Sequence, residues 1–521
     1  MNFSAAPILY FCFLAAVFIV YWLMWWSWWR QLVLLAASVA FYASLNLQYL
    51  PLLLVSTVLN FTLGLAIANA ENAPSSDTKS PEKNSHQTSS NKTREKPSSP
   101  ESDRQKSFLI LGVLLNVLLL FLYKYGTFFL SSFGSLISWS FLGREADWLQ
   151  TELVAPLGVS FFCFEFISYL VDVYRGESPS RNPLKFAAYK LFFPKLIAGP
   201  ITRYREMEPQ LRQQTFLPRN TILVEGLWSI ATGAIKKAIL ADRLAIYVNL
   251  TFENLQRAGS EDLWIATFAY GLQLYLDFSG YVDIARGSAM LFGITLPQNF
   301  RFPYLSTSIA DFWRRWHMTL GAWLRNYLYI PLGGSRAGLM RTYSNLIVVM
   351  LLAGLWHGGV GTQNDPTGFL IWGGIHGVGL AIHRINDAIA QKIGIWRFWW
   401  HSLPGMLLGW VMTQAMVFFA WIFFRLPNWQ NSTWVVNHLW GYTADVQFAQ
   451  KVYIETLGLD RLQLVSILGL LGIAMVVAYG IQQKLHLQLK WSLKIFLVPL
   501  CLYAVWLFSP ENTLPYIYFD F

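Results

Sequence analysis

The chain has 521 residues, of which 55% are hydrophobic, 17% aromatic and only 13% charged. Soluble domains carry about 25% charged residues, so this composition excludes a soluble enzyme and excludes disorder for most of the chain. Apolar runs of roughly 20 residues, the length that crosses about 30 Å of hydrocarbon as a helix, recur along the sequence and predict a polytopic membrane protein.

The formal net charge of +10 comes from Lys and Arg residues that lie largely in short loops between the apolar runs. Such loops orient membrane spans by the positive-inside tendency, and no nucleic-acid-binding motif accompanies them, so we expect no nucleic-acid partner. Cys12, Cys163 and Cys501 lie inside apolar runs without metal-ligand spacing. They predict neither a disulfide framework nor a metal site.

Residues 1–73 are predicted to form an N-terminal transmembrane unit. The first apolar run ends before Arg30, the first basic residue, which places Arg30 in the cytoplasm and Met1 outside. The next run, Leu32–Ala70, is long enough for two spans with a break at Asn46–Pro51, because Pro51 cannot continue the helical hydrogen bonds.

A polar segment follows at residues 74–106. It contains no Ala, Val, Ile, Leu, Met, Phe, Trp, Tyr or Cys. Because it cannot bury enough apolar surface to offset the entropy of ordering, it predicts a disordered cytoplasmic loop.

The rest of the chain predicts further spans, which bring the total to about ten or eleven in an all-α fold. These spans are expected at Phe108–Leu130, Val154–Tyr174, Leu263–Leu291, Tyr343–Gly358, Gly368–Ile385, Leu407–Phe424, Val465–Ile481 and Ile495–Leu507. The proline-interrupted stretch Arg175–Arg219 predicts short interfacial or re-entrant helices on the cytoplasmic side. The run Asn220–Leu240 carries Lys236 and Lys237 at one end, so the sequence leaves open whether it spans the membrane.

From Ile309 to Leu324 the apolar positions recur in steps of three and four. This period predicts one amphipathic helix in the interface plane, with Trp316 on the apolar face and Arg314 and Arg315 on the polar face. His317 falls at the edge of the apolar face. The pattern alone favours an interfacial histidine that is hydrogen-bonded to a neighbour.

Trp356 and His357 end a run that starts just after Arg341. The intervening helix would rise about 24 Å, so an interfacial Arg341 places His357 well inside the membrane. A buried neutral imidazole can accept a proton from a hydroxyl, which makes His357 a candidate functional residue. A core histidine bonded to a helix carbonyl fits the pattern about as well.

Two further ionisable residues, His376 and Asp277, lie in apolar runs. His376 could orient His357 or bind substrate, but the packing of glycine-notched helices explains it at least as well. Asp277 either pairs with a basic group or marks a helix break, and a structural role is favoured. The sequence contains no nucleophile elbow, P-loop or dinucleotide-binding motif in a suitable context.

The motifs, taken together and in order, resemble the membrane-bound O-acyltransferase superfamily. They are Phe192–Pro200, Asp277–Tyr281, Asp311–Leu320, Tyr327–Gly334, Trp356–Gly358 and Trp372–Gly377. Within the superfamily they resemble the bacterial branch of alginate O-acetyltransferases, whose neighbours are the D-alanyl transferases that modify teichoic acids. The resemblance covers roughly residues 154–383.

The resemblance implies a catalytic core at residues 107–400, in which tilted helices enclose a central tunnel, followed by C-terminal transmembrane helices at residues 401–521. It implies that His357 is the catalytic histidine and that His317 is a second functional histidine. The candidate substrate-binding or supporting residues are Trp316, Arg314, Arg315, Asn326, Trp356, His376 and Asp277.

Two departures from the family are visible. Asn326 stands where the family has an aspartate, so a role for negative charge at that position is not expected in this chain. Residues 360–367 look like an insertion after the Trp-His-Gly motif, and this loop could reshape the acceptor-side mouth of the tunnel.

The leading hypothesis is the transfer of an acetyl group from a cytoplasmic thioester, such as acetyl-CoA, to an exported polysaccharide at a bacterial inner membrane. No bound cofactor is expected. A separate extracytoplasmic acetyltransferase is expected as a partner, because the chain has no large soluble domain to position a polymer. The alternatives are the transfer of D-alanine or a longer acyl chain to an envelope polymer, a lipid or a protein, and a transporter with His357 and Asp277 as a proton relay.

Overall fold

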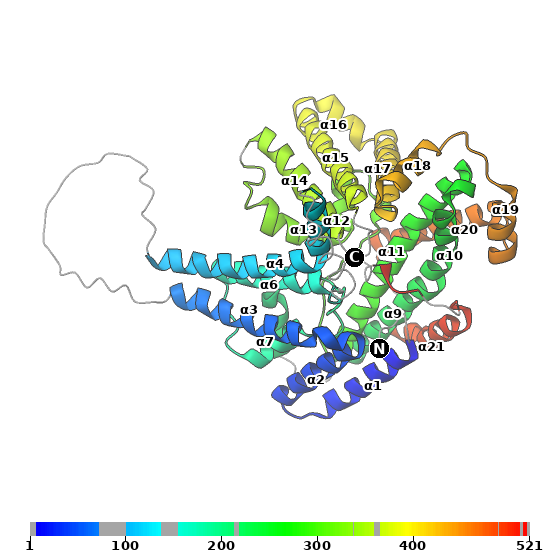
Figure 1. Cartoon of the computed structure of the whole chain (residues 1–521). Helices are drawn as coiled ribbons and strands as arrows, with labels where there is room; N and C mark the ends of the chain where they lie inside the picture. Colours follow the sequence, from blue (N-terminus) through cyan, green and yellow to red (C-terminus); the bar gives the residue numbers. More distant parts are fainter. Residues whose placement is uncertain are drawn as a thin grey trace, which may run out of the picture.

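The computed structural model describes residues 7–71, 100–136, 155–212, 218–336, 338–358, 365–487, 489–510 and 514–517. These residues form helices and connecting loops, and none of them is in a β-strand. The helices gather around a common centre (Figure 1), and the N–H of Ile517, near the C-terminus, donates to the buried Asp277. The predicted all-α membrane fold is confirmed.

The N-terminal unit contains three long helices: α1 (Pro7–Leu23), α2 (Ser27–Asn46) and α3 (Leu50–Glu71). The short 3₁₀ helix η1 (Leu47–Tyr49) separates α2 from α3. The predicted break near Pro51 is therefore confirmed, and Pro51 lies in the first turn of α3, where its missing N–H costs little.

The predicted disordered loop lies outside the described residues as far as position 99, but its last part was predicted wrongly. Residues 100–106 belong to α4 (Pro100–Leu136), which continues through the apolar run predicted at Phe108–Leu130. Adding a turn to an existing helix needs no new nucleus, so polar residues next to a strong apolar helix can remain helical.

Short helices occupy the proline-interrupted stretch after α6 (Val159–Tyr174). They are α7 (Pro183–Lys190) and α8 (Tyr204–Arg212), as the sequence predicted. Beyond them, α9 (Asn220–Ala234) runs through a π-helix, η2 (Ile235–Ala241), into α10 (Asp242–Glu253).

The longest described helix after α4 is α11 (Ser260–Leu291), which packs against α9, α10 and α17. A second closely packed pair is formed by α14 (Leu339–His357) and α15 (Thr367–Lys392). The remaining C-terminal helices are α16 (Gly394–His401), α17 (Leu403–Arg425), α18 (Trp429–Asn437), α19 (Val446–Ala449), π-helix η6 (Gln450–Leu457), α20 (Arg461–Tyr479), π-helix η7 (Gly480–Lys484) and α21 (Trp491–Phe508).

Within the described residues, six helical stretches are long and apolar enough to cross a membrane. They are Ser27–Ala70, Asp103–Gly126, Leu339–His357, Leu403–Arg425, Arg461–Lys484 and Trp491–Phe508. The first contains both α2 and α3, and α1 is a shorter apolar helix. The predicted count of ten or eleven also included α6, α11 and α15, of which α6 has only 16 residues.

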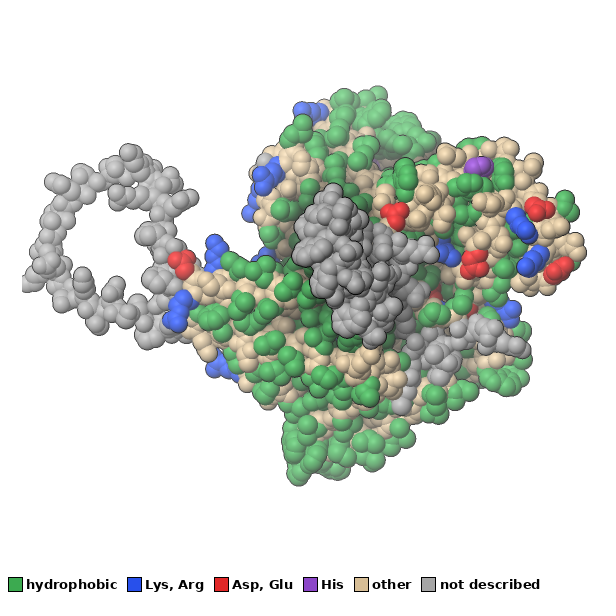
Figure 2. Space-filling model, in the orientation of Figure 1, with side chains coloured by type: hydrophobic (Ala, Val, Ile, Leu, Met, Phe, Trp, Pro, Cys, Tyr) green, Lys and Arg blue, Asp and Glu red, His purple; other side chains and the backbone are tan. Residues whose placement is uncertain are grey.

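The surface fits a lipid environment. Figure 2 shows hydrophobic side chains over much of the visible face, with charged side chains gathered mainly near its edges. On α4, for example, Leu114 and Leu118 are 60% and 51% exposed. Exposed apolar area of this extent is rare on soluble monomers and is typical of a surface that contacts membrane.

Candidate active site

His357 is the last residue of α14, and its side chain is buried. Four aromatic rings surround its imidazole: Trp356, Phe424, Trp372 and Phe369, with ring centroids 4.4, 4.9, 5.4 and 6.3 Å away. Gly358 ends the helix with an extended backbone, and its N–H donates to the Leu355 carbonyl. The result is an ionisable ring at a helix end inside an apolar, aromatic core.

Glycines bring α14 and α15 close enough to form this core. A Cβ atom on Gly354 would lie 2.2 Å from the Phe369 carbonyl oxygen, and a Cβ on Gly373 would lie 2.4 Å from the Met350 carbonyl oxygen. No real side chain fits at such distances, so the two backbones meet only because both positions lack a Cβ. This close approach places Trp372 of α15 beside His357.

The predicted continuous helix from Ile309 to Leu324 is wrong. The structure has two short helices, α12 (Ile309–Arg315) and α13 (Met318–Leu324), which are separated by Trp316 and His317. His317 has a φ of 42°, in the left-handed region that residues other than glycine rarely adopt. His317 is also fully buried, so it is not an interfacial histidine.

The loop that contains Asn299 stabilises this break. The Asn299 side-chain oxygen accepts from the backbone N–H and the hydroxyl of Thr319, and the His317 Nδ1 lies 3.2 Å from it. The Met318 N–H donates to the Asn299 carbonyl. Because an amide oxygen can only accept, this contact assigns the proton of the His317 ring to Nδ1 and leaves the lone pair on Nε2.

Aromatic side chains of α6 connect the rings around the two histidines. The ring of Phe161 contacts both His317 and Trp356, at centroid distances of 6.5 and 6.2 Å. Phe164 stacks on Trp323 at 4.2 Å and contacts Trp356 at 5.2 Å. His317 and His357 therefore belong to one continuous aromatic core.

His376, on α15, lies in the same core. Its ring packs against Trp372 at 5.0 Å and Trp313 at 5.3 Å, and neither ring nitrogen has a hydrogen-bond partner among the described residues. Trp372 therefore separates His376 from His357. Trp316 is also buried and contacts Phe312 and Trp421.

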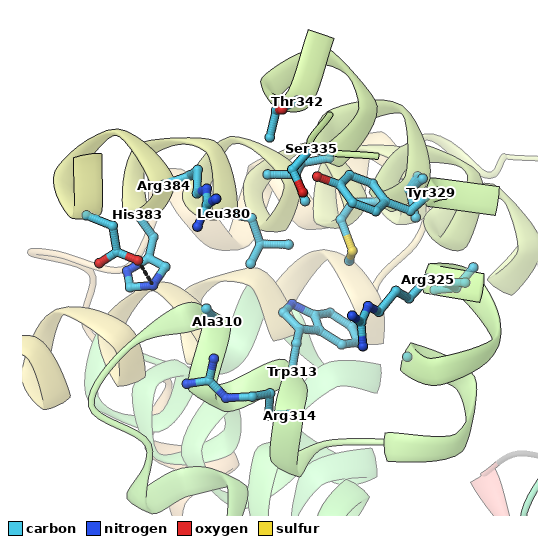
Figure 3. A pocket seen from close by; sticks show the side chains of 16 residues that line it. Ala310, Trp313, Arg314, Arg325, Tyr329, Ser335, Thr342, Leu380, His383 and Arg384 are labelled. Atoms are coloured by element: carbon cyan, nitrogen blue, oxygen red, sulfur yellow. Dashed lines mark ion pairs between the residues drawn. The ribbon is translucent and has the colours of Figure 1, made fainter. Parts of the chain in front are cut away.

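A pocket of about 500 Å³ opens between α12, α13, α14 and α15. Its lining includes three arginines, Arg314, Arg325 and Arg384, as well as Trp313 and Met350. Figure 3 shows Trp313 and Arg325 on one wall of this pocket and Arg384 on another. We call it the basic pocket.

The basic pocket approaches the histidine core without reaching it. Its wall residue Trp313 contacts both His376 and Trp372, and Trp372 contacts His357. Met350, another wall residue, precedes His357 by about two turns of α14. Two aromatic rings therefore lie between the pocket and His357.

Three of the predicted supporting residues lie outside the basic pocket: Asn326, Arg315 and Asp277. Asn326 lines a separate cavity with Arg175 and Tyr327, and its carbonyl accepts from the Arg175 guanidinium at 3.1 Å. Arg315 pairs with Asp311 at 2.8 Å and does not line the basic pocket.

Asp277 pairs with Lys237 at 2.6 Å and accepts from the backbone N–H of Ile517 at 3.1 Å. It contacts neither His317 nor His357 through these bonds. The geometry is that of a buried ion pair which holds the C-terminal residues.

Some residues near the histidines escaped the sequence analysis. Asn299 lies in a loop without a periodic pattern, and its partner His317 is 18 positions away. Lys124 of α4 donates to the Trp356 carbonyl at 2.6 Å, and Tyr125 donates to the Leu355 carbonyl. A lysine within an apolar run is itself a signal of function, and Lys124 lies in such a run.

The part of the chain that the structure describes contains no group of three His, Cys, Asp or Glu side chains that could hold a metal ion. The functional groups of the core are imidazole and indole rings. Such a set can transfer protons and enclose an apolar or acyl group.

Comparisons with known proteins agree with this geometry. A family model described as MBOAT, membrane-bound O-acyltransferase family, matches residues 107–427, which include both histidines and the basic pocket. A probable alginate O-acetylase of Pseudomonas syringae pv. tomato is 36% identical over 87% of this chain and 75% of its own length.

Two other relatives show similar coverage. A probable alginate O-acetylase of Azotobacter vinelandii is 36% identical over 87% of this chain and 80% of its own length. A peptidoglycan O-acetyltransferase of Helicobacter pylori is 34% identical over 84% of this chain and 79% of its own length. The chain therefore belongs to the membrane-bound O-acyltransferase family and is a multi-pass membrane O-acyltransferase.

Proposed function

We propose that this O-acyltransferase takes an acetyl group from acetyl-CoA in the cytoplasm and passes it across a bacterial inner membrane to hydroxyl groups of an exported polysaccharide. The observation that carries the proposal is the burial of His357 in an aromatic core that a basic pocket approaches from the arginine-rich end of α14 and α15. By the positive-inside tendency that end faces the cytoplasm.

The basic pocket suits the anionic part of the donor. Arg314 forms only a long contact with Asp311, at 3.4 Å, while Arg325 and Arg384 have no ion-pair partner among the described residues. Arginine forks match phosphate oxygens, so they would receive the phosphates of a coenzyme A thioester. The acyl end would then have to pass Trp313 and Trp372 to reach His357, which requires a donor that carries its acyl group at the end of a long, narrow chain.

His357 supplies the base for acyl transfer. A hydroxyl is a weak nucleophile at neutral pH, and an imidazole that removes its proton typically contributes about 10²–10⁴-fold. The hydroxyl oxygen bonds to the acetyl carbon, the carbon–sulfur bond breaks, and the thiolate takes up the proton that His357 accepted. The products are an acetyl ester and a free thiol.

His317 has a separate role in this proposal. Its Nδ1 is directed to Asn299, so Nε2 carries the lone pair and is the atom that can accept a proton or a hydrogen bond. The ring faces Phe161 and Phe278, which places it on the α6 and α11 side of the core.

The relatives name two candidate polymers. Alginate and peptidoglycan are both exported and both carry sugar hydroxyls, which is why we place the acceptor among envelope polysaccharides. Because no described domain could position a long polymer, we propose that a separate extracytoplasmic acetyltransferase completes the transfer.

The test measures acetyl esters in cells that lack the gene, both on exported polysaccharide and on peptidoglycan. We expect the wild-type gene to restore esters on one of these polymers and His357→Ala to restore none, with both proteins at equal levels by immunoblot. His401→Ala, which alters an exposed histidine of α16, is the matched control and should restore esters fully. Unchanged esters in the deletion strain would refute the acetyl-transfer proposal, and full rescue by His357→Ala would remove that residue from the reaction.

A further inference from the structure

Lys124 is a buried lysine in a helix that otherwise faces lipid on much of its length. It lies in the apolar stretch Asp103–Gly126, yet its side chain is only 1% exposed. From Lys106, at the polar start of this stretch, the helix rises about 27 Å to Lys124. An ammonium group at such a place is costly and persists where it has a specific partner.

The partner of Lys124 is the end of α14. Its Nζ donates to the Trp356 carbonyl at 2.6 Å and lies 5.2 Å from the centroid of the Trp356 ring. The neighbouring Tyr125 hydroxyl donates to the Leu355 carbonyl. Two consecutive side chains of α4 thus bind the last-turn carbonyls of α14, which lack partners within their own helix.

We propose that Lys124 is a positioning residue for His357, an inference that rests on the proposed function. The Trp356 carbonyl belongs to the peptide group that joins Trp356 to His357. Holding this peptide plane fixes the direction in which the His357 side chain leaves the helix. A terminal helical residue without such a bond is prone to fray, so a fixed peptide is what keeps the imidazole in one place.

The electrostatics favour a cation at this position. The carboxyl end of a helix carries partial negative charge on its free carbonyls, and a buried ammonium group there is stabilised by it. The face of the Trp356 indole adds a second attraction. A neutral side chain of similar length would experience neither attraction, whereas an arginine would experience both.

Loss of the Lys124 hydrogen bond is expected to displace His357 more than loss of the Tyr125 hydrogen bond. The Leu355 carbonyl also accepts the Gly358 N–H, so losing the Tyr125 bond leaves it satisfied. Among the described residues, no backbone N–H donates to the Trp356 carbonyl, which accepts from Lys124. Tyr125→Phe is therefore a matched control on the same helix.

The experiment uses inverted membrane vesicles from cells that express the full chain, with acetyl-CoA added outside and free thiol release as the readout. Vesicles carrying His357→Ala give the background. We expect Lys124→Met to lower kcat by about tenfold to a hundredfold while KM for acetyl-CoA changes by less than about twofold, because a small displacement of a catalytic group costs rate rather than donor binding. Lys124→Arg should recover most of kcat, and Tyr125→Phe should stay within about threefold of wild type.

A further control is Lys494→Met, which removes another buried lysine from a membrane helix. Lys494 of α21 pairs with Glu225 of α9, the helix against which α21 packs, so its loss should leave kcat unchanged. Thermal unfolding of each purified variant in detergent separates a loss of folding from a displacement of His357. If Lys124→Met does not fold, the kcat of the folded Lys124→Arg variant decides whether Lys124 positions His357.

The outcomes separate the two claims. No acetyl-CoA-dependent thiol release by the wild type would overturn the proposed function and this inference with it. Wild-type release with an unchanged kcat in Lys124→Met would overturn the inference alone. A folded Lys124→Arg variant as slow as Lys124→Met would also overturn it, whereas a recovered kcat with constant KM supports it.

Discussion

The His317 imidazole and the Asn299 amide form a pair that fixes a helix break at the centre of the molecule. The His317 Nδ1 lies 3.2 Å from the Asn299 side-chain oxygen, and His317 has a φ of 42°. A non-glycine residue in this conformation stores strain that its surroundings must offset. Here the hydrogen bonds of Asn299 provide the offset, because its amide oxygen contacts His317 and Thr319 and its backbone carbonyl accepts the Met318 N–H.

The first prediction concerns Asn299→Leu. The substitution removes the acceptor for His317 and Thr319, so we expect acetyl transfer to fall about tenfold and the free energy of unfolding to fall by about 1–3 kcal/mol. Ester content of the polymer and thermal unfolding in detergent check both effects. Gln298→Leu, which loses one bond to the Phe300 carbonyl, is the neighbouring control. Equal activity of the Asn299 and Gln298 variants would show that the amide does not position His317.

The same pair shows why part of the site escaped prediction. The three-and-four period from Ile309 to Leu324 continues in register across the break, and no proline interrupts it. The break arises from tertiary contacts with residues 299–301, where the Met318 N–H reaches the Asn299 carbonyl and the Arg301 N–H reaches the Arg315 carbonyl. Periodicity records which side chains are apolar and carries no information on such backbone pairing.

Other parts of the fold were predictable because local chemistry decides them. The end of α14 at His357 follows from the two glycines that come after it, and the η1 interruption follows from the position of Pro51. Lys124 could have been noticed as a charge in an apolar run. Its partner, the Trp356 carbonyl, lies 232 positions away and depends on how α4 packs in space.

The second prediction separates His376 from His357. Both histidines are buried, but neither ring nitrogen of His376 is hydrogen-bonded among the described residues, and its ring packs on Trp313 and Trp372. We therefore expect His376→Phe to retain transfer within about fivefold, since packing rather than proton transfer is lost, while His357→Ala loses about 10²–10⁴-fold. The assay is thiol release by vesicles at equal protein levels. A loss in His376→Phe as large as that in His357→Ala would give His376 a chemical role.

The third prediction tests the basic pocket. Removing Arg325 or Arg384 deletes a cation that would bind a donor phosphate, so we expect KM for acetyl-CoA to rise about tenfold while kcat is unchanged. Raising ionic strength should also raise KM for the wild type and do so less for these variants. Arg315→Ala is the control, because Arg315 pairs with Asp311 outside the pocket. An equal rise in KM for Arg315→Ala would locate the donor elsewhere.

The last prediction concerns the glycine contact that places α15 against α14. A Cβ on Gly373 would lie 2.4 Å from the Met350 carbonyl oxygen, which is a backbone atom that cannot rotate away. Gly373→Ala should therefore push the helices apart and lower the free energy of unfolding by about 1–3 kcal/mol, with transfer reduced because Trp372 moves away from His357. Gly374→Ala is a strict control on the next residue, since its Cβ would meet only Leu351 Cδ2 at 3.8 Å, an ordinary contact. Thermal unfolding and thiol release of the two variants give the answer, and equal behaviour would mean that the close approach of these helices does not set the geometry at His357.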